Sequence, residues 1–123
     1  MSSNLSVTPQ AAPFANKVLS ADVDATVCAN ATGTTGVLYL ADIDNTGNAL
    51  ETLYLKLYDD AAPTVGTSDP NWIFKIKGGE RKTYAIPDGI AFDVALSFAA
   101  VQSPGTPGTT GPSNPIPVTF LTT

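Results

Sequence analysis

From Lys17 to the end of the chain, short runs of alternating apolar and polar residues are separated by turns rich in Gly, Pro, Asn and Asp. The clearest run is 53–58, where three leucines alternate with Tyr54, Lys56 and Tyr58. A period of two residues is typical of a β-strand with one buried face. The 123 residues include 10 Gly and 10 Pro, which interrupt every window long enough for a helix. The pattern therefore predicts an all-β protein.

About eight short strands at roughly 8–12-residue spacing favour a single β-sandwich, of either jelly-roll or immunoglobulin-like connectivity. The sandwich domain is expected to span 17–123, because a chain of this length fits one domain. Residues 1–16 hold two Pro and show neither the period of a helix nor that of a strand, so we expect an extended N-terminal arm. The runs 72–77 and 81–86 flank Gly78-Gly79 and predict a hairpin. The Gly/Pro-rich stretch 102–115 is expected to form an exposed, polyproline-like loop.

The composition excludes several classes of function. The chain has no His and one Cys, which rules out a Ser-His-Asp triad, a Cys-His pair, a zinc cluster and an internal disulfide. Cys28 lies in an apolar run, so a buried, inert thiol is expected. The formal net charge is −5, which disfavours nucleic-acid binding. We therefore expect a binding or structural protein that is not an enzyme and uses no cofactor and no metal.

The acidic residues leave two chemical alternatives open. Asp42, Asp44 and Glu51 could form an irregular cation site, although their spacing departs from the EF-hand loop. Asp59-Asp60, or Asp88 with Asp93, could act as paired carboxylates in glycoside hydrolysis. The favoured interpretations are a solvated strand end running into a hairpin for the first group and loop caps for Asp59-Asp60.

Two groups of residues are candidates for an interface. Four of the six cations fall on the two arms of the predicted hairpin, where they could repel unwanted strand pairing or bind an acidic neighbour. Aromatic residues on neighbouring strands could complete the core, line a protein interface or stack on a sugar. The candidate interface residues are Lys75, Lys77, Arg81, Lys82, Trp72, Tyr54 and Tyr58.

Two segments carry a resemblance to a known family. Residues 55–70 read LKLYDDAAPTVGTSDP, and residues 87–92 read PDGIAF. Both are similar to segments of small virion structural proteins of tailed bacteriophages, in which a strand ending in Lys-Leu-Tyr leads to an Ala-Pro-Thr-Val-Gly-Thr loop. The resemblance covers roughly residues 50–98, about two-fifths of the chain. It implies a β-sandwich with a place on the virion, most often as a decoration or cement protein of the capsid.

The expected function is therefore that of a virion protein which binds and stabilises the capsid shell as a homo-oligomer. Its expected partners are the major capsid protein or other virion proteins and further copies of itself, with no nucleic acid and no membrane. The N-terminal residues lack the basic and apolar regions of a secretory signal, so synthesis in the host cytoplasm is expected. The alternative is a tail, neck or fibre component, including a module that binds host glycans through Trp72 and the tyrosines.

Overall fold

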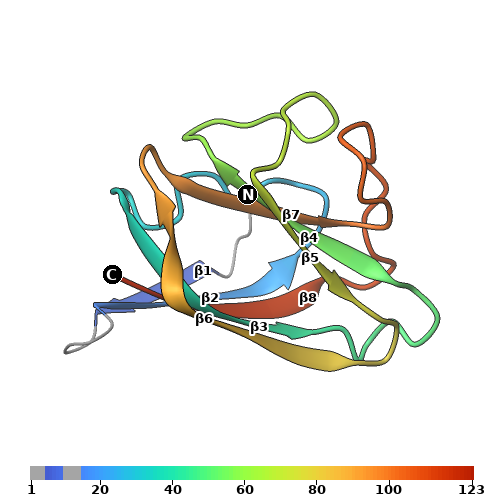
Figure 1. Cartoon of the computed structure of the whole chain (residues 1–123). Helices are drawn as coiled ribbons and strands as arrows, with labels where there is room; N and C mark the ends of the chain where they lie inside the picture. Colours follow the sequence, from blue (N-terminus) through green and yellow to red (C-terminus); the bar gives the residue numbers. More distant parts are fainter. Residues whose placement is uncertain (1–4, 10–14) are drawn as a thin grey trace.

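A computed structural model describes residues 5–9 and 15–123, and these residues form an all-β protein. Eight strands occur in the described ranges: β1 (Leu5–Pro9), β2 (Asn16–Val23), β3 (Gly36–Asp44), β4 (Leu53–Asp59), β5 (Trp72–Ile76), β6 (Arg81–Phe92), β7 (Leu96–Val101) and β8 (Ile116–Thr122). They pack as two facing antiparallel sheets, which confirms the predicted β-sandwich (Figure 1).

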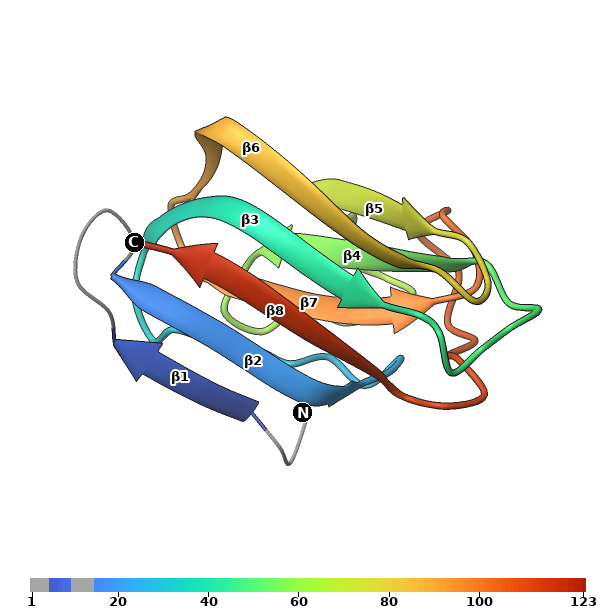
Figure 2. The same ribbon diagram turned by 90° about the horizontal axis from the view of Figure 1, so that it is seen from below.

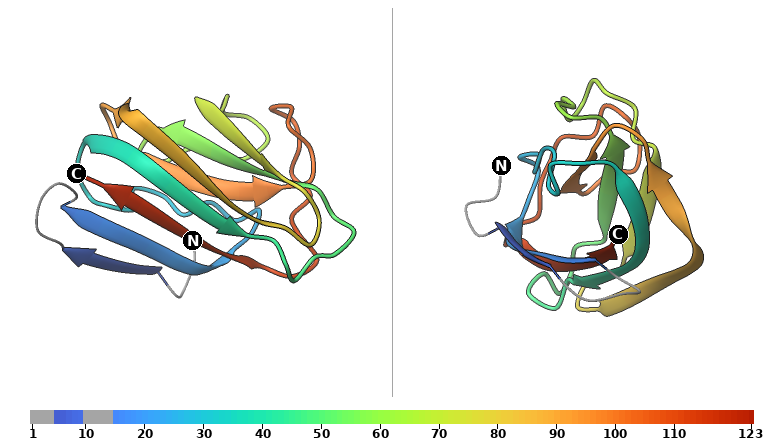
Figure 3. Two further views of the ribbon diagram at one scale, coloured as in Figure 1. Left: turned by 60° about the horizontal axis from the view of Figure 1, so that its bottom comes forward. Right: turned by 90° about the vertical axis from the view of Figure 1, so that its left-hand side faces the viewer.

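The larger sheet, as far as the chain is described, has the strand order β1-β2-β8-β3-β6, and the smaller sheet has the order β5-β4-β7. In the left-hand view of Figure 3, the strands of both layers run obliquely across the molecule. One end of the sandwich holds Asp44, Leu53 and Ile76, and the opposite end holds Asp59 and Phe92. We call these the Asp44 end and the Asp59 end.

The connectivity is that of a jelly roll. A bridge from Cys28 to Phe98 extends the smaller sheet beyond β7, with the amide of each residue donating to the carbonyl of the other at 2.8 and 3.1 Å. Counting segment 24–31 as a short fourth strand gives the order segment–β7–β4–β5 facing β2-β8-β3-β6. This order interleaves strands from both halves of the chain, as two Greek keys do. It decides between the two predicted connectivities in favour of the jelly roll.

The predicted hairpin across Gly78-Gly79 is wrong. Strand β5 pairs with β4 in the smaller sheet, whereas β6 pairs with β3 in the larger sheet. The turn therefore connects the two sheets and closes one side of the sandwich. The physical reason is that the inward faces of both strands, which carry Phe74 and Tyr84, meet in the core instead of lying on one surface.

Part of the predicted N-terminal arm belongs to the sandwich. Leu5–Pro9 pairs with β2 in an antiparallel register that joins Leu5 to Ser20 and Pro9 to Asn16. The strand is therefore extended, as expected, but it lies at the edge of its own larger sheet. Asn16 already belongs to β2. Residues 1–4 and 10–14 of the predicted arm lie outside the described residues.

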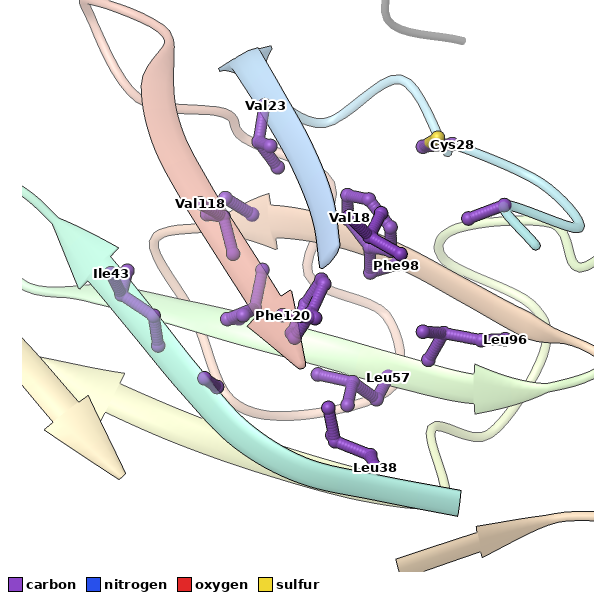
Figure 4. Packing of buried hydrophobic residues seen from close by; sticks show 14 of the residues in the cluster. Val18, Val23, Cys28, Leu38, Ile43, Leu57, Leu96, Phe98, Val118 and Phe120 are labelled. Atoms are coloured by element: carbon purple, nitrogen blue, oxygen red, sulfur yellow. The ribbon is translucent and has the colours of Figure 1, made fainter. Parts of the chain in front are cut away.

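Side chains from both sheets meet in one hydrophobic core (Figure 4). The three leucines of 53–58 point into it and are fully buried, which confirms the alternation seen in the sequence. Phe98 of β7 packs edge-to-face on Phe120 of β8, with ring centroids 4.9 Å apart. Cys28 is buried at the rim of this core, in agreement with the prediction of a buried thiol.

Candidate functional site

Three exposed lysines surround the turn that joins the sheets. Lys75 and Lys77 lie at the end of β5, and Lys82 lies at the start of β6. Arg81 is also exposed, but its guanidinium donates two hydrogen bonds to the Asp42 carboxylate, at 2.9 and 3.1 Å. That contact raises the pKa of Arg81 and cancels its charge. The basic cluster predicted from the sequence therefore reduces to Lys75, Lys77 and Lys82, which we call the basic tip.

Tyr84 connects the two strands at the basic tip. Its ring stacks on Phe74 at 4.8 Å between centroids, and its hydroxyl donates to the backbone carbonyl of Lys75. The Lys82 ammonium lies 5.1 Å from the centroid of the same ring, within the range of a cation–π interaction. These contacts hold the lysine-bearing ends of β5 and β6 together, although the two strands belong to different sheets.

A network of asparagine side chains, in which Asn45 and Asn48 are buried, joins the turn of the basic tip to the neighbouring loops. Asn45 donates to the carbonyls of Glu51 and Lys77 at 2.7 and 3.1 Å, and Asn48 donates to the Asn45 side chain and to the carbonyl of Asn114. The turn glycine Gly78 is closely packed, because a Cβ there would lie 2.6 Å from the carbonyl oxygen of Ala49. The hairpin predicted after Asp44 is wrong, because β3 and β4 lie in different sheets, and the sequence gave no signal for this network.

The outer face of the larger sheet is open. In Figure 2, none of the described segments crosses in front of β1, β2, β8, β3 and β6. We call this surface the open face. The register places Leu19 beside Thr119, and Leu121 beside Leu40, on its central strands. Leu19 is 36% exposed, and Leu40, Leu121 and Thr119 are half-buried. The centre of the open face therefore holds three leucines and Thr119, with Lys17 beside Leu121 and Asp42 beside Thr119.

The outer face of the smaller sheet is covered by the chain itself over most of β4 and β7, whereas Ile73 and Lys75 on the outer side of β5 are exposed. Loops 60–71 and 102–115 lie on its far side from the larger sheet (Figure 1). The outward side chains beneath them are almost completely buried, including Tyr58, Ser97, Ala99 and Val101. The two loops contact each other, since the Thr106 hydroxyl donates to Asp69 at 2.7 Å. We call this surface the covered face.

Lys56 anchors the second of these loops. Its side chain is fully buried, and its ammonium donates to the carbonyls of Gly105 and Gly108 at 2.7 and 3.2 Å. Burial lowers the pKa of this ammonium. Further hydrogen bonds close the loop, from the Gln102 amide to the Thr110 carbonyl and from Ser113 to the Glu51 carboxylate. Residues 102–115 are mostly exposed, as predicted, but these hydrogen bonds fix the loop onto the covered face.

The aromatic residues do not gather on an exposed surface. Tyr58 is 1% exposed, and burial raises the pKa of its hydroxyl. Trp72 packs against the core, and Tyr54 is half-buried on the covered face. Of the residues predicted for an interface, the structure thus brings only the lysines and Arg81 together at the surface.

The acidic residues mostly serve local structure. Asp42 binds Arg81, Asp44 accepts from the hydroxyl and amide of Thr46, and Glu51 binds Ser113. These three carboxylates, weighed as a cation site from the sequence, therefore have separate partners. No group of three or more candidate metal ligands occurs in the part of the chain that the structure describes.

Asp59 and Asp60 form loop caps, as predicted. The Asp59 carboxylate accepts hydrogen bonds from the amides of Asp93, Val94 and Ala95 at 2.8–3.2 Å. Burial acts to raise its pKa, but the three amides outweigh burial and the pKa lies below its ordinary value. The Asp60 side chain accepts from the Ala62 amide at 2.9 Å. These contacts fix the start of the loop that crosses the covered face.

Comparisons with protein-family models, with curated proteins and with solved structures find no match to this chain. The described residues contain no helix that is long and apolar enough to cross a lipid bilayer.

Proposed function

We propose that this chain is a bacteriophage virion structural protein that binds the capsid shell as a decoration or cement protein and acts as a homo-oligomer. The observation that carries the proposal is the difference between the two outer faces. The covered face is occupied by the chain's own loops, whereas the open face presents Leu19, Leu40 and Leu121 with no described segment over them. A surface of partly exposed leucines bordered by Lys17 and by the Asp42–Arg81 ion pair suits contact with a larger protein surface.

The size of the open face supports binding in several copies. Five strands spaced about 4.8 Å apart and about eight residues long on average give an area of roughly 650 Å². A stable interface buries about 800 Å² on each partner. One open face therefore provides less area than a stable contact needs. Repetition around a symmetric oligomer would raise the affinity through avidity.

The assignment to a virion is supported by the resemblance of residues 55–70 and 87–92 to small phage structural proteins. In the structure, the first segment forms most of β4 and the loop over the covered face, and the second forms the end of β6. Both segments therefore shape the sandwich, and neither contains Leu19, Leu40 or Leu121. This division suits a scaffold whose binding surface differs from one virus to the next.

The test is co-sedimentation of purified protein with cognate particles that lack it. We expect binding at micromolar concentration, and at least a tenfold loss of affinity for Leu19→Glu on the open face. Ile73→Glu is the matched control, because Ile73 on β5 is 41% exposed, close to the 36% of Leu19. Absence of binding, or equal losses for both variants, would contradict the proposal. Hundreds of copies per particle support a shell protein, whereas tens or fewer indicate a tail, neck or fibre component.

A further inference from the structure

The outermost strands of the two sheets present backbone groups that can pair with a strand of another molecule. Among the described residues, the larger sheet ends in β1 and β6, and the smaller sheet ends in β5 and, beyond β7, in segment 24–31. Proteins protect such edges with charged side chains, prolines, bulges or covering segments. The four edges can therefore be compared by the protection that each one carries.

Three of these four edges are protected. Strand β6 begins with two cations, and Pro87, which has no amide hydrogen, lies in the stretch where the pairing with β3 shifts register. Strand β5 carries Lys75, whose backbone carbonyl already accepts a hydrogen bond from the Tyr84 hydroxyl. The edge of β7 is covered by segment 24–31, which is bonded to it but forms no continuous strand of its own.

The edge of β1 lacks this protection over most of its length. Its sequence is Leu-Ser-Val-Thr-Pro, with no charged side chain and with proline only at the last position. The register with β2 is continuous over all five residues, without a bulge. In Figure 2, no described segment lies beyond β1. Among the edges that the described residues form, β1 is therefore the one that is open to a further strand.

Val7 is an apolar side chain of β1 that the fold leaves partly uncovered. It pairs with Val18 of β2, whose side chain belongs to the core. Val18 is fully buried, whereas Val7 is 38% exposed. The core therefore ends beneath β2, and the inward side of β1 extends past it. A further strand beside β1 would cover Val7 with an inward side chain of its own.

We propose that β1 of one copy pairs antiparallel with β1 of a second copy of this chain, across a two-fold axis at Val7. This register places Val7 opposite the partner's Val7, Ser6 opposite the partner's Thr8 and Leu5 opposite the partner's Pro9. A second copy is the occupant that the strand fits, because each apolar residue then meets an apolar residue and each hydroxyl meets a hydroxyl.

The backbone of β1 can satisfy this register in either alternation. If Ser6 and Thr8 direct their backbone groups to the free edge, two pairs exchange both hydrogen bonds; if Leu5, Val7 and Pro9 do so, the two pairs with proline lose one bond each. Either alternation gives about four hydrogen bonds between the copies. Such a contact is isologous, so it closes after two copies and leaves β1 with a neighbour on both sides.

The pairing also joins the two open faces. Outward side chains of paired strands lie on the same side of a sheet, so the open faces of both copies point in one direction. Two faces of roughly 650 Å² give about 1,300 Å², which exceeds the ~800 Å² that a stable interface buries on one partner. The contact therefore deepens the proposed function, and rests on it for the role of the open face, by supplying a homo-oligomer whose copies face the same shell.

The test is the molar mass of purified protein, measured by light scattering without particles. Because the contact is small, we expect the wild type to be a dimer at about 100 μM and to dissociate on dilution. Val7→Lys and Val7→Glu each bring like charges together at the axis, so each variant alone should have the mass of a monomer. An equimolar mixture of the two should recover the dimer, because the introduced ammonium then faces the introduced carboxylate.

Ile73→Glu is the matched control, since Ile73 is 41% exposed on the protected edge strand β5, and it should keep the wild-type mass. The pairing is overturned by a wild-type mass other than that of a dimer, by an unchanged mass in both Val7 variants, by a mixture that stays monomeric, or by an equal loss of mass in Ile73→Glu. Particle binding is measured separately. A dimer that does not bind particles refutes the shell proposal alone, and a monomeric wild type that binds them refutes the pairing alone.

Discussion

The two outer faces of this sandwich are built from strands with the same alternating pattern, but they differ in how far their outward side chains are exposed. On β4 and β7 of the smaller sheet, the outward residues Lys56, Tyr58 and Ala99 are buried under loops. On β2 and β6 of the larger sheet, the outward residues Leu19 and Ala85 remain exposed. Alternation in a strand therefore shows which side chains share a face, but the connecting loops decide whether that face meets solvent. The covered face behaves as a second, thinner core.

The largest expected effect tests this view with one substitution made on both faces. Ala99 on the covered face is fully buried opposite Lys56, so Ala99→Leu must displace loop 102–115 or strain the sheet. We expect it to lower the free energy of unfolding by about 3 kcal/mol. Ala85→Leu on the open face should change it by less than about 0.5 kcal/mol. Urea denaturation measures both, and equal effects would show that the two faces do not differ.

A smaller effect is expected where the loop over the covered face begins. Asp59→Asn removes the charge that accepts three amides, and we expect a loss of about 2 kcal/mol at pH 7. Because folding lowers the pKa of Asp59, its contribution is complete above the ordinary value of 3.8 and disappears as the pH falls below it. The difference between wild type and variant should therefore shrink in acid. Asp60→Asn is the control, since that side chain accepts one amide, and a difference that persists at pH 2 would contradict this account.

The smallest expected effect on stability is that of removing the Tyr58 hydroxyl, which is buried beneath the loops of the covered face. The buried hydroxyl of Tyr58 has no hydrogen-bond partner within the described chain, which is unfavourable for a polar group shielded from water. Tyr58→Phe should therefore raise the free energy of unfolding by about 1 kcal/mol. Tyr54→Phe, at a half-buried position on the same face, should have little effect. A destabilised Tyr58→Phe would show that the hydroxyl makes a hydrogen bond in the wild type, to a water molecule beneath the loops.

The sequence was sufficient to predict the fold class and the inward face of the clearest strand. Leu53, Leu55 and Leu57 are buried, as their alternation required, and the apolar setting of Cys28 predicted its burial. Of the candidate interface residues, Lys75, Lys77 and Lys82 are exposed and close to one turn, where their spacing around Gly78-Gly79 placed them.

Other features could not be predicted, for physical reasons. A Gly-Gly turn between two alternating runs is compatible both with a hairpin and with a crossing between sheets, and the choice depends on contacts such as Phe74 with Tyr84. Backbone carbonyls have no sequence signature, so nothing marked Gly105 and Gly108 as acceptors for Lys56. The one available signal was a lysine placed between two leucines in the most regular strand, where a charge needs partners.

The position of β8 has a consequence for how the molecule is made. This strand is synthesised after the other seven described strands, yet it lies between β2 and β3 in the middle of the larger sheet. While a ribosome still holds residues 116–122, β2 and β3 have no neighbour between them, and the surface that later becomes the open face does not exist. Binding through the open face must therefore wait until residues 116–122 have left the ribosome. Pairing across so long a stretch of chain also predicts slow folding, on the scale of milliseconds to seconds.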